Sequence, residues 1–199
     1  LRDGAGAQYG SDAVAGVINI VLKKARSGGS AAVSYGANHT DFKPTHDTKT
    51  DGQTTIVSAD YGVPVGDAGF VRFGAETRDR NPTNRAGRSD AGWTSWNATP
   101  QDLALDGQVV FKSGDSEQKN HYLFYNALVP LAAGVDAYSF ATVNQRKSDG
   151  SAYFRYPGDP SNVASIYPGG YRPGTRGDMT DTSVVAGLRL AGGAWNWDL

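Results

Sequence analysis

Several stretches of this chain alternate between apolar and other residues with a period of two, and this alternation constrains the fold more than any other feature. Residues 54–63 place every second side chain on one face, formed by Thr55, Val57, Ala59, Tyr61 and Val63. Residues 69–79, 118–129 and 182–190 repeat the pattern, and residues 135–146 predict a further strand with two mixed faces. Because side chains alternate between the two faces of a strand, we expect an all-β protein.

The connections between these strands alternate between short and long. Short ones lie near residues 63–68, 130–134 and 191–194, and long ones near residues 40–52, 80–117 and 148–181. This order predicts an antiparallel up-and-down meander of about seven strands, with all the long loops at one end. Long structureless loops are uncommon in soluble domains, whereas outer-membrane barrels combine short periplasmic turns with long extracellular loops.

Composition excludes several classes of protein. The 199 residues contain no Cys, which excludes a disulfide scaffold, a Cys-ligated zinc site and a thiol nucleophile. A formal net charge of -1 gives no electrostatic reason to expect nucleic acid as a partner. The apolar run at residues 13–22 is interrupted by Asn19 and is shorter than the roughly 20 residues of a membrane-spanning helix. No grouping of residues predicts a catalytic site, a metal site or a cofactor, and we expect none.

Residues 1–25 differ from the rest of the chain. They contain, in order, the segments Leu1-Arg2-Asp3-Gly4, Gln8-Tyr9-Gly10-Ser11-Asp12-Ala13-Val14 and Ala15-Gly16-Val17-Ile18-Asn19-Ile20. In identity and spacing these segments resemble the end of the plug domain of TonB-dependent outer-membrane receptors, although Ala5 stands where many members have Pro. The β-branched residues 16–24 also predict a buried strand. The glycines miss the spacing of a dinucleotide-binding loop, and no strand precedes them.

The resemblance implies a 22-stranded transmembrane β-barrel, with residues 1–25 as the C-terminal end of the plug domain and residues 26–199 as the first strands of the barrel. It implies energy-coupled uptake of a scarce ligand across the bacterial outer membrane, such as a siderophore, cobalamin or carbohydrate, without enzymatic chemistry. The implied partners are the TonB complex, outer-membrane lipid and an extracellular small ligand. Twenty-two strands alone need roughly 220 residues, so the chain is expected to be a fragment without the TonB-contacting segment.

The long loops contain the residues that we expect to contact ligand. Aromatic and Arg side chains provide broad, rigid contact surfaces, and the candidates are Trp93, Trp96, Tyr153, Arg155, Tyr156, Tyr171 and Arg172. The aromatic residues also fit the interfacial girdle of a membrane barrel. In TonB-dependent receptors, arginines of the plug pair with glutamates of the barrel. The resemblance therefore makes Arg2 and Glu76 candidates for a plug-barrel contact. A solvated carboxylate on the channel wall is the alternative for Glu76.

A secreted soluble β-sandwich or lectin-like binding module is the alternative function, because it also combines alternating strands with loops rich in Trp and Tyr. The two hypotheses differ in the apolar face of the strands. A sandwich buries that face within the chain, whereas a barrel presents it to lipid.

Overall fold

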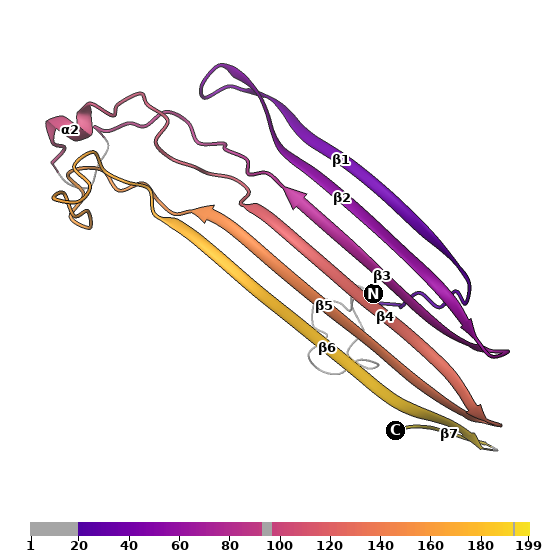
Figure 1. Cartoon of the computed structure of the whole chain (residues 1–199). Coiled ribbons are helices and arrows are strands. Elements are labelled where there is room, and N and C mark those ends of the chain that lie inside the picture. Colours follow the sequence, from indigo (N-terminus) through magenta and orange to yellow (C-terminus); the bar gives the residue numbers. More distant parts are fainter. Residues whose placement is uncertain (1–19, 93–96, 193) are drawn as a thin grey trace.

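The structure is a computed structural model that describes residues 20–92, 97–192 and 194–199 (Figure 1). Its strands are β1 (Gly28–Phe42), β2 (Asp47–Val65), β3 (Gly69–Arg80), β4 (Glu117–Ala132), β5 (Val135–Ser151), β6 (Gly174–Gly192) and β7 (Trp195–Asp198). They form one sheet in the order of the sequence, and each strand pairs antiparallel with the next. The predicted all-β, up-and-down meander is therefore confirmed for the described residues, as an open sheet that is not closed into a barrel.

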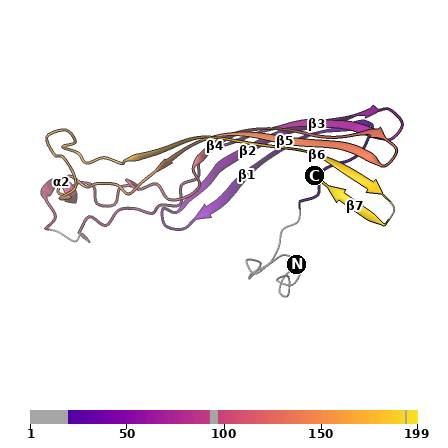
Figure 2. The same ribbon diagram turned by 90° about the horizontal axis from the view of Figure 1, so that it is seen from below.

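The strands lie in a single curved layer when the sheet is viewed along its edge (Figure 2). The three turns β2–β3, β4–β5 and β6–β7 lie at one end, and the loops of residues 81–116 and 152–173 lie at the other (Figure 1). Gly66 at φ 58° and Gly134 at φ 74° supply the positive φ that the first two of these turns require. The predicted placement of the three short turns at one end of the sheet, and of the two later long loops at the other, is correct.

The predicted long connection at residues 40–52 is wrong. β1 and β2 continue through this region to a tight turn at residues 43–46, where the amide of Thr45 donates to the carbonyl of Phe42 at 3.2 Å. Thr40 pairs with Lys49 and Asp41 with Thr48. Backbone hydrogen bonds hold these polar residues in the ladder, so the strands extend beyond the stretch in which apolar residues alternate. β5 and β6 likewise extend into the predicted loop 148–181 and leave only residues 152–173 outside strands.

The buried strand predicted at residues 16–24 is also not found where the structure describes it. From Ile20 onward the segment is not a strand, and the side chains of Ile20 and Val21 are 80% and 74% exposed. Its carbonyl groups accept hydrogen bonds from side chains of β3 and β4 instead of from a neighbouring strand. Residues 1–19, which carry the rest of the resemblance and Arg2, lie outside the described residues.

A short helix, α2 (Pro100–Leu103), lies in the first long loop. Within the part of the chain that the structure describes, no helix has the length and apolar character needed to cross a membrane.

Candidate functional site

One face of the sheet is a continuous apolar surface. The register aligns Tyr61 with Phe73, Phe73 with Tyr125, Tyr125 with Ala141 and Ala141 with Val184. Adjacent rows on this face contain Val57, Ala59, Val63, Val71, Ala75, Leu123, Ala127 and Val143. This register confirms that the predicted apolar sets of β2, β3 and β4 share one face.

Large apolar side chains on this face are exposed rather than buried against other parts of the described chain. Phe73 is 50% exposed and Val184 is 65% exposed, and an open groove of about 930 Å³ runs over the centre of the face. Monomeric soluble proteins rarely expose a contiguous apolar surface of this kind, because its hydration is unfavourable. The face therefore requires an apolar partner or an apolar solvent.

The apolar surface has a defined height along the strands. On β5 it runs from Val135 at the turn end to Val143, and the eight-residue step corresponds to about 27 Å along the strand. With a strand tilt of 35–45°, the height becomes about 19–22 Å, a few Å less than the roughly 25 Å apolar band of outer-membrane barrels. A polar row that contains Gln145 follows toward the loops. Beyond it, two ion pairs lie on the same face, Lys147 with Asp178 at 3.6 Å and Arg176 with Asp149 at 3.0 Å.

Aromatic residues mark the turn end of the same face. Trp195 and Trp197 of β7 pair with Gly192 and Leu190, and their rings are 6.4 Å apart. Trp is enriched where an apolar layer meets water, because its ring is apolar and its N–H is polar. The apolar surface is thus flanked by tryptophans at its turn end on β7, and by charged pairs toward the loops on β5 and β6.

The two long loops pack against each other beyond the charged pairs. Phe111 of the first loop lies 5.1 Å from the ring of Tyr153 and 6.0 Å from that of Tyr156 in the second, both in edge-to-face geometry. Arg172 donates to the carbonyl of Val110 at 3.2 Å. Edge-to-face pairs stabilise contacts beyond simple area burial, so the loops form one unit at this end of the sheet.

Asp102 joins the loops through a cap that the sequence analysis missed. Its carboxylate accepts from the amide of Thr99 at 2.8 Å, while the Thr99 hydroxyl accepts from the Asp102 amide, and the pair forms a capping box for α2. The second carboxylate oxygen accepts from the amide of Gly158 at 2.8 Å. Asp102 is fully buried. The sequence Thr-Pro-Gln-Asp at residues 99–102 is a capping signal and would have predicted this helix start.

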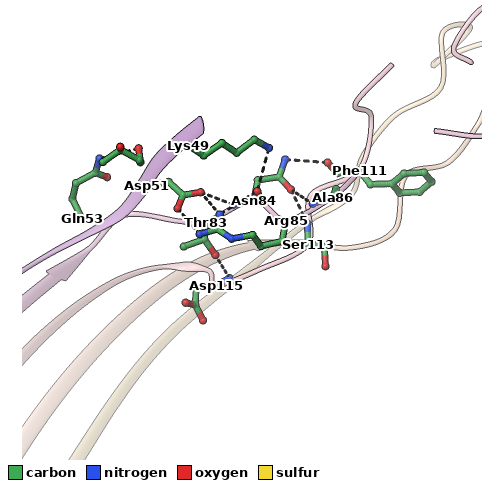
Figure 3. Close-up of polar contacts among 11 residues, drawn as sticks. Lys49, Asp51, Gln53, Thr83, Asn84, Arg85, Ala86, Phe111, Ser113 and Asp115 are labelled. Carbon is green, nitrogen blue, oxygen red and sulfur yellow. Dashed lines mark hydrogen bonds and ion pairs between the residues drawn. The ribbon is translucent and has the colours of Figure 1, made fainter. Parts of the chain in front are cut away.

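The base of the first loop is fixed to β2 by an ion pair (Figure 3). The Arg85 guanidinium donates to both carboxylate oxygens of Asp51, at 2.5 and 2.8 Å, and the Asn84 amide adds a bond at 3.2 Å. The hydrogen bonds from Arg85 hold the pKa of Asp51 below its usual range. A bidentate Arg–carboxylate pair restricts orientation as well as distance, so it defines where the loop leaves the sheet.

Asn84 connects the two halves of the first loop. Its side-chain nitrogen donates to the carbonyl of Phe111 at 3.3 Å, and its side-chain oxygen accepts from the amides of Ala86 and Ser113, both at 3.0 Å (Figure 3). Lys49 of β2 donates to the Asn84 carbonyl at 3.4 Å. These bonds hold Phe111 in position for its contacts with the second loop.

A cationic and aromatic hollow of about 560 Å³ lies where the loops meet, next to this base. Arg88, Lys112, Phe111 and Tyr153 contribute to its lining. Among the described residues, no hydrogen bond or ion pair engages the Lys112 ammonium group, and Tyr153 is exposed. These groups suit a ligand that carries negative charge together with a flat or apolar part.

The other candidates for ligand contact lie in different settings. Tyr156 is buried in the aromatic cluster, Tyr171 stacks on Tyr167 at 4.3 Å, and the backbones of Arg155 and Tyr171 bond to each other. Trp93 and Trp96 lie outside the described residues. Tyr153 is thus the candidate whose side chain is both exposed and adjacent to the hollow, and ligand contact by all of these residues stays a prediction.

Glu76 lies on the polar face of β3, where its carboxylate is 3.6 Å from the guanidinium of Arg78. Its predicted partner Arg2 lies outside the described residues, so their contact also stays a prediction.

Comparison with known proteins identified no family: no family model, curated protein or solved structure matches the chain. The functional argument therefore depends on the two faces of the sheet and on the loop unit.

Proposed function

We propose that this sheet is part of the wall of a TonB-dependent receptor in the bacterial outer membrane, which imports a scarce ligand. The observation that carries the proposal is the exposed apolar face, whose height is within a few Å of the apolar band of outer-membrane barrels and which is flanked by tryptophans on β7 and by charged pairs on β5 and β6. The order of the segments in residues 1–20 supports the same assignment.

In this proposal the apolar face contacts lipid and the opposite face lines the lumen. A strand within a bilayer needs all of its backbone groups paired, and an antiparallel meander supplies these bonds between neighbours. The outer edge of β1 needs a partner strand in the same way, and closure of a barrel would provide it.

The loop unit is the proposed place of ligand capture on the extracellular side. The hollow beside Lys112 and Tyr153 offers positive charge and aromatic surface there. Energy from the TonB complex would then drive release of the ligand into the lumen, and the chain needs no catalytic residue for that task.

The exposed apolar face argues against the alternative of a soluble β-sandwich. A sandwich covers that face with a second sheet, but the described residues form one sheet and leave Phe73, Leu123 and Val184 exposed. This observation favours lipid as the partner of the face.

Membrane fractionation of the full-length protein tests the proposal. We expect the protein in the outer-membrane fraction, resistant to carbonate extraction, and shifted in gel mobility on boiling as barrels are when they unfold. Recovery in the soluble fraction, or release by carbonate, would refute it. Binding of the purified periplasmic domain of TonB to the full-length protein tests the proposed partner separately.

A further inference from the structure

Residues 20–27, named the strap here, lie against the polar face of the sheet near its turn end. They are not paired as a strand, yet side chains from β2, β3 and β4 bond to them. The strap is therefore held by a site made of side chains rather than by a backbone ladder.

Asp60 of β2 is the centre of that site. Its carboxylate accepts from the Lys23 ammonium at 2.5 Å and from the Ser30 hydroxyl at 2.7 Å, and it forms an ion pair with Arg72. The side chains of Asp60 and Arg72 are only 7% and 6% exposed. A carboxylate so enclosed requires charged or hydrogen-bonding partners, because burial of an unpaired charge is unfavourable.

Arg72 and Asn126 bind the backbone of the strap. The Arg72 guanidinium donates to the backbone carbonyl of Ala25 at 3.0 Å, and the side-chain amide nitrogen of Asn126 donates to the backbone carbonyl of Lys23 at 3.0 Å. In return, Arg26 of the strap donates to the carbonyls of Gly66 and Gly69 in the β2–β3 turn, at 3.0 and 3.2 Å.

Gly62 provides the space for this contact. A Cβ atom at position 62 would lie 2.4 Å from the Ala25 carbonyl oxygen and 3.0 Å from the Arg72 guanidinium. Any side chain there would displace the strap or Arg72. The site thus combines a buried ion pair, two donors to backbone carbonyls and a glycine that allows close approach.

We propose that Asp60, Arg72 and Asn126 form a docking site for the chain's own strap, and that this site keeps residues 23–26 on the wall as a fixed anchor for the segment that precedes them. The docking concerns contacts within the chain. Its role as the anchor of a plug rests on the proposed function.

Lys23 and Lys24 form a matched pair for the test. The Lys23 ammonium is bound to Asp60, whereas among the described residues Lys24 has no side-chain partner. Lys23→Gln and Lys24→Gln each remove one positive charge and one tryptic site, so only the contact with Asp60 distinguishes them. The assay is limited trypsin digestion of the full-length protein in detergent micelles, with cleavage after Arg26 followed by mass spectrometry.

We expect Lys23→Gln to raise the cleavage rate about two- to five-fold, the modest effect of a partly exposed ion pair, and Lys24→Gln to leave it unchanged. Asp60→Asn should raise the rate about tenfold or more, because two charged donors lose their partner. Salt at 1 M should reduce the difference between the two lysine variants.

Rapid cleavage in the unaltered protein, or equal rates in the two lysine variants, would overturn the proposal. Lys23→Gln retains the pair of Asp60 and Arg72, so it decides the question even if Asp60→Asn does not fold. Membrane fractionation is independent of strap cleavage, so failure of this inference and failure of the proposed function are distinguishable.

Discussion

Arginine at position 184 provides a stringent test of the lipid-facing assignment. Val184 is 65% exposed on the apolar face and pairs with Ala141, one row from the middle of the apolar rows between Val135 and Val143. If that face contacts lipid, Val184→Arg should lower the free energy of unfolding by about 2–4 kcal/mol, the cost of Arg near the bilayer midplane. This corresponds to a change of about 30- to 900-fold in the folding equilibrium.

Ser183→Arg is the matched control. Ser183 is the adjacent residue of β6 and lies on the opposite face, in the row of Thr142. Arginine there faces the proposed lumen and should change stability by no more than about 0.5 kcal/mol, as at most surface positions. The assay is urea unfolding of the full-length protein in lipid vesicles, followed by tryptophan fluorescence. Equal losses in both variants, or no loss in either, would refute the assignment.

Three further predictions concern named contacts. Asp51→Asn should loosen the first loop at pH 7, seen as faster proteolysis within residues 81–92. The folded pKa of Asp51 lies below its unfolded value of about 3.9. The ion pair therefore contributes its full stability above about pH 3.9 and loses it as the pH falls through the folded pKa, so wild type and variant should converge in acid. Gly74→Ala should destabilise the sheet by about 1–3 kcal/mol in urea unfolding, since its Cβ would lie 2.5 Å from the Phe124 ring and 2.9 Å from the Ala59 carbonyl oxygen; full stability would contradict this packing. Asp102→Ala should cost about 1–3 kcal/mol, because it removes the α2 cap and leaves the Gly158 amide unpaired, and unchanged thermal unfolding of the loops would contradict this role.

The sequence predicted the strands wherever one face is apolar. In β2, β3, β4 and β6 the alternation follows directly from the pleat, so both the strands and the shared face could be predicted. It did not predict that β1 and β2 pair through residues 40–49, because the polar residues there show no apolar alternation and backbone bonds form the ladder. It predicted a strand at residues 20–24 from β-branched composition, but strand formation also needs a neighbouring edge, and side chains bind this segment instead.

The candidate site was less predictable. The contact between the two long loops follows from the meander, but its geometry depends on Asn84, Phe111 and Asp102, which show no periodicity. Asp60 and Arg72 flank the β2–β3 turn on the polar face, so the turn position alone could have predicted their proximity. Lys23 could not be assigned to them, because the strap has no register with the sheet.

The central claim is that one face of this sheet contacts lipid and the other does not. The 199 residues contain no Cys. Nitroxide labels would therefore be attached to single cysteines introduced along β6, at Ser183, Val184, Val185, Ala186 and Leu188, in a full-length protein whose other cysteines, if any, are replaced. Collisions with oxygen, which concentrates in the bilayer, and with a water-soluble nickel chelate would be measured by electron paramagnetic resonance in lipid vesicles. We predict high oxygen accessibility and low nickel accessibility at positions 184, 186 and 188, and the loss of this preference at 183 and 185. Accessibility without a period of two, or nickel accessibility at position 184 as high as at 183, would contradict the account.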